Sequence, residues 1–96
     1  MIDDFPTPPI IEEHNSERQR ALRIVDRVSA KTATCRKDIV GHSRRRRLVV
    51  PRHWAMWLIR QNTTLSLVEI GQLFSGRDHT SILHGIRRYE TEWSKQ

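Results

Sequence analysis

Apolar residues recur at the spacing of one helix face in the first third of the chain. The stripe consists of Ala21, Leu22, Ile24, Val25 and Val28. Arginines occupy much of the opposite face, which is typical of an amphipathic surface helix. Ser16 and Gln19 have the spacing of a capping box, in which each side chain satisfies a free amide of the first turn. The pattern therefore predicts a helix that begins at Asn15 or Ser16.

The middle of the chain predicts a connection over residues 31–34, a helical turn at Asp38-Ile39-Val40 and a loop over residues 41–47. Pro51 suits the first position of the next helix, where its missing N–H costs nothing. The buried face of that helix runs to about Gln61 and comprises Trp54, Ala55, Trp57, Leu58 and Ile59. At helical spacing among aliphatic residues, the tryptophans are interpreted as core rather than as a stacking surface for single-stranded bases.

The last third predicts two helices joined by a tight turn. Ser66 and Glu69 repeat the capping-box spacing and start a short helix that ends near Phe74. Gly76 can adopt the left-handed conformation that ends a helix. Asp78 is a good N-cap for a final helix, whose apolar side comprises Ile82, Leu83, Ile86, Tyr89 and Trp93. Because no stretch alternates like a strand, the predicted fold is all-α and contains a helix-turn-helix.

Residues 1–14 contain three prolines, four acidic residues and no Lys or Arg. We interpret them as a flexible acidic arm that precedes a single domain over residues 15–96. The alternative is a short acidic peptide that docks on a partner or folds back on the basic face of the domain.

The charge of the chain indicates which kind of molecule it binds. The chain after residue 15 carries 17 Lys and Arg against 7 Asp and Glu, a net charge of +10. Such an excess predicts binding to polyanions, with nucleic acid first, although an anionic membrane or an acidic protein fits the charge equally well. With one cysteine, no apolar run of membrane-spanning length and no secretory signal, we expect a cytoplasmic, nucleoid-associated protein. Cys35 is expected to be a small packed side chain.

The first turn of the final helix offers groups that can read base edges. Asp78 can accept from cytosine N4 or adenine N6, His79 can donate to guanine, and Thr80 offers a hydroxyl and a methyl group. Arg77 can reach a base or a phosphate. The run Arg44, Arg45, Arg46 and Arg47 lies on a loop and suits phosphates or a narrow minor groove.

Residues 76–85, GRDHTSILHG, closely resemble the signature of the C-terminal DNA-binding domain (domain IV) of the bacterial replication initiator DnaA. Residues 51–58, PRHWAMWL, and residues 66–71, SLVEIG, look like the same family in the same order. The resemblance covers about residues 18–93. It implies a Trp-repressor-like helical fold that binds a short A/T-rich duplex site, the DnaA box.

The resemblance also implies residue roles. Arg44 falls on the family's minor-groove arginine, and Asp78, His79 and Thr80 fall on its base-reading positions. Positions that contact the DNA backbone or support the reading residues are matched by Arg52, His53, Arg60, Leu67, Val68, Arg77 and Ser81.

Three of these positions depart from the family. His53 replaces a common glutamine, Val68 a common proline and Ser81 a common second threonine. These changes could loosen phosphate contacts or alter base preference. The dense arginine run should raise nonspecific affinity.

The sequence contains no group of residues typical of a catalytic site. The chain has no Gly-rich loop for ATP phosphates, so we expect neither nucleotide binding nor ATP hydrolysis. The histidines and Cys35 lack zinc-ligand spacing, and Asp78, His79 and Ser81 on one turn cannot converge as a hydrolase triad, so no cofactor or metal is expected.

The favoured hypothesis is sequence-specific binding of double-stranded DNA with a regulatory role in replication initiation or transcription. The chain could be an independent gene product or a piece of a larger initiator. Two alternatives remain open: a protein-interaction factor of the replication machinery with secondary DNA contact, and RNA binding through the arginine run.

Overall fold

The computed structural model describes the backbone of residues 9–93 and the side chains of residues 16–92, and within these bounds it is helical and contains no strand. The helices are α1 (Pro9–Thr32), α2 (Arg36–Val40), α3 (Arg46–Asn62), α4 (Leu67–Leu73) and α5 (His79–Arg88). A π-helical turn, η1 (Tyr89–Trp93), continues α5. The all-α prediction is confirmed.

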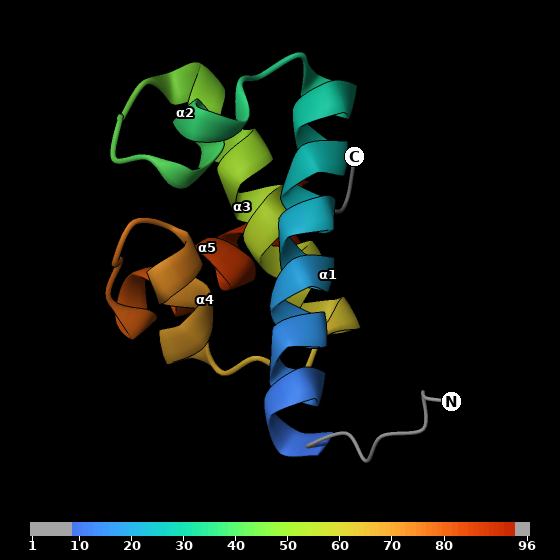
Figure 1. The fold of residues 1–96 in the computed structure, drawn as a ribbon. Coiled ribbons are helices and arrows are strands. Elements are labelled where there is room, and N and C mark those ends of the chain that lie inside the picture. Colours follow the sequence, from blue (N-terminus) through green and yellow to red (C-terminus); the bar gives the residue numbers. More distant parts are fainter. Residues whose placement is uncertain (1–8, 94–96) are drawn as a thin grey trace.

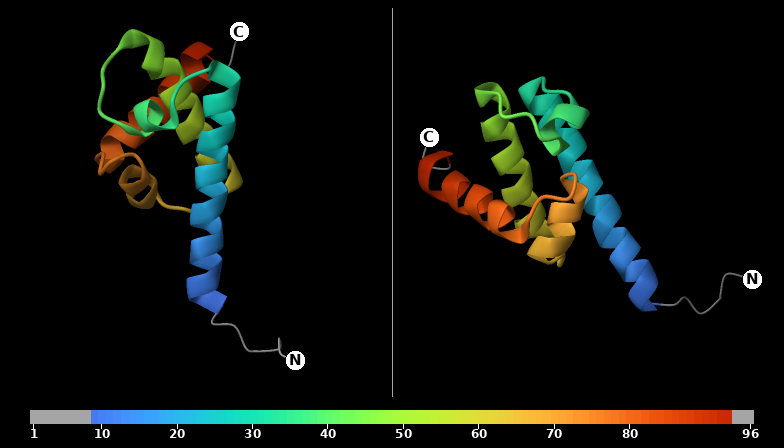
Figure 2. Two further views of the ribbon diagram at one scale, coloured as in Figure 1. Left: turned by 45° about the horizontal axis from the view of Figure 1, so that its top comes forward. Right: turned by 90° about the vertical axis from the view of Figure 1, so that its left-hand side faces the viewer.

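Helix α3 is the centre of the molecule and packs against every other element. The long helix α1 covers one side of α3, while α2, α4 and α5 lie on the other side (Figure 1). The α2–α3 loop, residues 41–45, and the turn between α4 and α5 project on the same side of the molecule in Figure 1 and in the left view of Figure 2.

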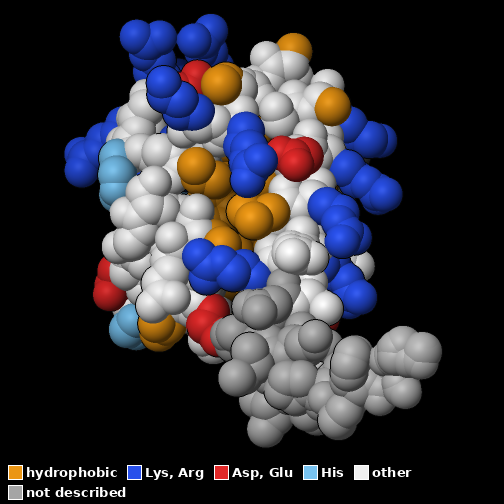
Figure 3. Space-filling model, in the orientation of Figure 1, with side chains coloured by type: hydrophobic (Ala, Val, Ile, Leu, Met, Phe, Trp, Pro, Cys, Tyr) orange, Lys and Arg blue, Asp and Glu red, His pale blue; other side chains and the backbone are white. Residues whose placement is uncertain are grey.

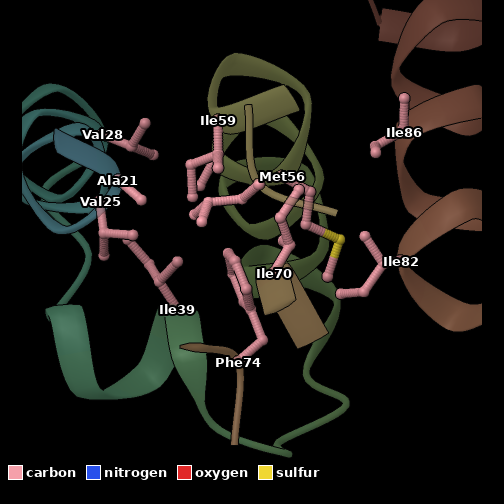
Figure 4. Packing of buried hydrophobic residues seen from close by; sticks show 12 residues of the cluster. Ala21, Val25, Val28, Ile39, Met56, Ile59, Ile70, Phe74, Ile82 and Ile86 are labelled. Carbon is pink, nitrogen blue, oxygen red and sulfur yellow. The ribbon is translucent and has the colours of Figure 1, made fainter. Parts of the chain in front are cut away.

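The core joins side chains from all five helices. Its largest fully buried members include Phe74, Ile39, Met56, Ile59 and Ile70. Figure 4 shows these side chains pointing toward one another from α2, α3, α4 and the start of the turn after α4. The stripe predicted on α1 reaches this core through Ala21, Val25 and Val28, which are all buried. Trp54 and Trp57 are partly buried against the cluster, which agrees with their interpretation as core residues.

Helix α1 begins earlier than predicted. It starts at Pro9 rather than at Asn15 or Ser16, so Ser16 and Gln19 lie inside the helix and do not cap it. Proline is favoured at the first helical position because its fixed φ suits the helix and its missing N–H is not needed there. Residues 9–14 of the expected arm thus belong to α1, whereas residues 1–8 lie outside the described part of the chain.

Helix α3 also begins earlier than predicted, at Arg46, so Pro51 lies inside it. Leu48 is 2% exposed, and burying it in the first turn draws the helix start toward the arginines. Pro51 has no N–H to donate to the Arg47 carbonyl, yet its ring is buried. As a correction to the expected loop over residues 41–47, Arg46 and Arg47 therefore belong to the first turn of α3.

Cys35 is exposed, contrary to the expectation of a packed thiol. It is the N-cap residue of α2, where the chain turns at the surface between two helices. Ile39, rather than Cys35, supplies the buried side chain of this region.

Candidate nucleic-acid interface

Helix α4 begins with the predicted capping box. The Ser66 hydroxyl accepts from the Glu69 amide at 3.2 Å, and the Glu69 carboxylate accepts from the Ser66 amide at 2.8 Å. Two free amides of the first turn are thereby satisfied. The box fixes the start of α4, while Ile70 anchors the helix in the core.

The turn after α4 is left-handed at two successive residues. Gly76 has a φ of 75°, as predicted, and Ser75 has a φ of 63°. The Arg77 amide then donates to the Gly71 carbonyl at 3.0 Å, which closes the turn against α4. A Cβ atom on Gly71 would lie 2.2 Å from the Arg77 oxygen, so this approach of two backbones requires glycine.

Asp78 caps α5, as predicted. Its carboxylate accepts from the Thr80 amide at 3.2 Å and also from the Thr80 hydroxyl. These two hydrogen bonds, the hydroxyl's first, lower the pKa of Asp78. The Asp78 carboxylate is therefore held as an anion at the start of the helix, 3.5 Å from the His79 Nδ1 atom.

The first turn of α5 presents its polar groups to solvent. His79, Thr80 and Ser81 are exposed, whereas Ile82 and Ile86 on the opposite face are buried. Gly85 lets α5 approach α3, because a Cβ atom there would lie 2.6 Å from the Met56 sulfur. The packed face thus fixes the orientation in which the polar turn is displayed.

Arg52 organises the α2–α3 loop from inside the protein. Its guanidinium donates to the carbonyls of Ile39 at 2.8 Å, Ser43 at 2.7 Å and Asp38 at 2.7 Å. The side chain is 4% exposed, and burial, followed by the charge of Arg77, lowers its pKa. The resemblance left two roles open for Arg52, contact with the DNA backbone or support of the reading residues. Its buried position fits the supporting role.

The exposed arginines of the α2–α3 loop and of the first turn of α3 lie on the outer surface. They are Arg44, Arg45, Arg46 and Arg47. Figure 3 shows lysine and arginine side chains gathered over the upper left of the molecule, where α2 and this loop lie in Figure 1. Between residues 16 and 92 no ion pair joins these four arginines to an acidic side chain, so their charge is available to an anion.

Arg77 links the loop to the helix-turn-helix. Its Nη2 atom donates to the Gly41 carbonyl at 2.8 Å. The side chain is half-buried, and desolvation followed by the charge of Arg44 lowers its pKa. Arg44, Arg52 and Arg77 therefore form one positively charged region beside the first turn of α5.

The remaining predicted positions differ in their surroundings. His53 is half-buried beside Gly85, and desolvation, then Arg88, lowers its pKa to about 4, so it is neutral at pH 7. Arg60 lies at the far end of α3 and donates to the Leu65 carbonyl at 3.4 Å. Leu67 packs against the core, whereas Val68 is 55% exposed.

Two residues that join the α2–α3 loop to the turn after α4, His42 and Ser75, were not predicted from the sequence. The Nε2 atom of His42 lies 2.9 Å from the Ser75 carbonyl oxygen, and the Ser75 hydroxyl donates to the Val40 carbonyl at 2.6 Å. These contacts connect residues more than thirty positions apart, which no local pattern reveals.

In the part of the chain that the structure describes, no three His, Cys, Asp or Glu residues are grouped so that they could hold a metal ion. Among the same residues, no helix combines the length and the apolarity that crossing a membrane requires.

An exposed polar helix start that follows a tight turn, next to a cluster of arginines, defines a helix-turn-helix DNA-binding domain. Residues 22–88 match the family described as the bacterial dnaA protein helix-turn-helix. The chain belongs to this family.

The relatives are chromosomal replication initiator proteins DnaA. That of Thermomicrobium roseum is 53% identical over 55 residues, which cover 57% of this chain and 12% of the relative. That of Roseiflexus castenholzii is 36% identical over 83 residues, or 86% and 17% of the two chains. That of Thermus thermophilus is 41% identical over 69 residues, or 72% and 16%. The chain thus spans less than a fifth of the length of these relatives. A comparison with solved structures gave no match.

Proposed function

We propose that this domain binds double-stranded DNA sequence-specifically at DnaA-box-like, A/T-rich sites, with α5 in the major groove and Arg44 in the adjacent minor groove. The observation that carries the proposal is the exposed polar turn His79–Ser81 beside the arginine cluster of the α2–α3 loop. Family membership supports DNA as the partner.

Base reading is assigned to Asp78, His79 and Thr80. A carboxylate can accept more hydrogen bonds than the two that Thr80 donates, so Asp78 retains a free acceptor for cytosine N4 or adenine N6. His79 is exposed and can donate to guanine. The Thr80 methyl group suits contact with a thymine methyl group.

Backbone positioning is assigned to the cations around this turn. Arg45, Arg46 and Arg47 are exposed and suit phosphates, while the half-buried Arg77 lies close enough to Arg44 to be affected by its charge. Of the further positions, we assign DNA-backbone contact to Arg60, Val68 and Ser81, which are exposed, and support to Arg52, His53 and Leu67, which are buried or half-buried.

The proposed role is control of replication initiation or transcription at such sites, where the domain would compete with full-length initiators for the same boxes. This role is inferred from the relatives, which are chromosomal replication initiator proteins, and from the short part of their length that matches this chain.

Fluorescence anisotropy at near-physiological salt tests the proposal with two short duplexes, one carrying a DnaA box and one with that box scrambled. We expect a preference of ~10³-fold or more for the box. Equal affinities with a steep salt dependence would refute sequence-specific binding and leave only charge as the source of affinity. That outcome would favour the alternative in which the domain serves mainly as a protein-interaction factor of the replication machinery.

A further inference from the structure

Three hydrogen bonds join the α2–α3 loop to the turn between α4 and α5. We call them the loop–turn bridge. They run from His42 Nε2 to the Ser75 carbonyl at 2.9 Å, from Ser75 Oγ to the Val40 carbonyl at 2.6 Å, and from Arg77 Nη2 to the Gly41 carbonyl at 2.8 Å. Because a carbonyl oxygen only accepts, the His42 Nε2 atom carries the proton in this contact.

Ser75 takes part in two of these contacts from an unusual backbone conformation. Its φ of 63° lies in the left-handed region, which residues with a Cβ atom rarely adopt. In this conformation the Ser75 carbonyl meets the His42 ring while its hydroxyl meets the Val40 carbonyl. Strained residues of this kind persist where the surrounding contacts over-determine them, and the bridge supplies such contacts.

The bridge lies immediately before the arginine assigned to the minor groove. Arg44 follows Ser43, whose carbonyl is fixed from the inside by Arg52 at 2.7 Å. On the other side of the bridge, Asp78 and His79 follow Arg77 directly in the chain. A segment held at both ends loses less conformational freedom when it binds, and this increases affinity without adding a contact.

We propose that His42 and Ser75 are positioning residues that fix the Arg44 loop and the start of α5 as one rigid unit, so that the two elements enter adjacent grooves at a set offset. This inference rests on the proposed function. His42 and Ser75 are both exposed, so removing their side chains leaves no cavity in the core.

The first test is a double-mutant cycle on the box duplex, with wild type, Arg44→Ala, the double variant His42→Ala/Ser75→Ala, and the triple variant. In the wild-type background we expect Arg44→Ala to weaken binding roughly tenfold or more. In the background without the His42 and Ser75 side chains, the same change should weaken binding less than about threefold, because two of the three bridge contacts that fix Arg44 are lost. An equal cost in both backgrounds would overturn the proposal.

The second test needs no DNA. NMR order parameters of the amides at residues 41–45 should be about 0.85 in the wild type and below about 0.6 in His42→Ala/Ser75→Ala, while those of α3 stay unchanged. His42→Gln, which retains a donor at a similar reach, should restore both the order parameters and the Arg44 effect. If the loop amides remain equally rigid in the double variant, the His42 and Ser75 contacts do not fix the loop, and the proposal is wrong.

Ser29→Ala is the matched control. It removes a hydroxyl-to-carbonyl hydrogen bond of the same 2.6 Å length, to Thr34 just after the C-terminal end of α1, and should change neither measurement. If the wild type itself does not distinguish the box from its scrambled form, the proposed function fails and the DNA role of the bridge fails with it. The order parameters still decide separately whether the bridge fixes the loop.

Discussion

The backbone of Gly71 in α4 lies directly against the backbone of Arg77 in the following turn. The Arg77 amide donates to the Gly71 carbonyl at 3.0 Å, and a Cβ atom on Gly71 would lie 2.2 Å from the Arg77 oxygen. The atom that a new side chain would meet belongs to the backbone, so it cannot rotate away. This contact sets the angle between the two helices of the helix-turn-helix.

Gly71→Ala is therefore expected to destabilise the fold by about 3 kcal/mol, because the turn has to move away from α4. Urea unfolding followed by circular dichroism measures the change. Gly76→Ala is the matched control, since a Cβ atom there meets open space and only the φ of 75° is unfavourable. Its cost should be about 1 kcal/mol. Equal costs for the two variants would show that the close approach is unimportant.

Arg52→Lys is expected to lower the free energy of unfolding by about 2 kcal/mol. A lysine ammonium on a flexible stem cannot replace a planar guanidinium that donates to three carbonyls at 2.7–2.8 Å. Arg36→Lys is the control, because the Arg36–Asp26 ion pair at 3.3 Å is exposed and should contribute less than about 1 kcal/mol. If both variants unfold at the same urea concentration, the Arg52 hydrogen bonds do not stabilise the loop.

The sequence predicted those elements that depend on local signals. The capping box at Ser66, the left-handed Gly76 and the N-cap Asp78 are each specified within four residues and are all confirmed. The start of α3 was wrong, since Pro51 looked like a first-turn residue while the burial of Leu48 moves the start to Arg46. Local patterns carry no information on which distant element a side chain will meet.

The same reason separates what the sequence predicted of the candidate site from what only the folded chain reveals. Asp78, His79 and Thr80 were predicted as base-reading residues from their residue types at the start of a helix and from the family resemblance. The burial of Arg52 under the α2–α3 loop and the contact between His42 and Ser75 arise only when the loop folds against the turn. The residue type alone did not distinguish the exposed Arg44 from the buried Arg52.

Lowering the pH should destabilise the domain through His53. Its pKa is about 4 in the folded protein, below the ordinary value of 6.5, so between these values the unfolded chain binds the extra proton. The stabilisation present above pH 6.5 is therefore lost as the pH falls toward 4. From pH 7 to pH 5 we expect a loss of about 1 kcal/mol from this group, allowing for the part of the ring that solvent screens.

His53→Gln isolates this effect, because the amide does not titrate while other groups of the protein do. Urea unfolding at pH 7 and pH 5 should give a smaller loss of stability for His53→Gln than for the wild type. The hypothesis fails if the two proteins lose the same free energy.

His79→Ala is expected to reduce the preference for the box over the scrambled duplex by roughly 1–3 kcal/mol, the contribution of one lost base contact. Its affinity for scrambled DNA should stay nearly constant, since His79 is exposed and makes no core contact. Anisotropy on both duplexes measures the ratio. A parallel loss on both duplexes would assign His79 to the DNA backbone instead of to a base.

Arg44→Ala should make the salt dependence of binding shallower. Each cationic side chain that leaves the interface lowers the slope of log affinity against log salt by about 1, because fewer counterions are released from the DNA. The exposed Arg44 lies beside Arg77, so its removal also lowers the local positive potential next to α5. Lys31→Ala is the charge-matched control, since this exposed residue lies in the last turn of α1 and is not one of the residues assigned to DNA contact. Titrations of the box duplex at several salt concentrations should give a shallower slope for Arg44→Ala and a wild-type slope for Lys31→Ala. Equal slopes for all three proteins would exclude Arg44 from the interface, whereas an equal reduction in both variants would show that net charge alone controls binding.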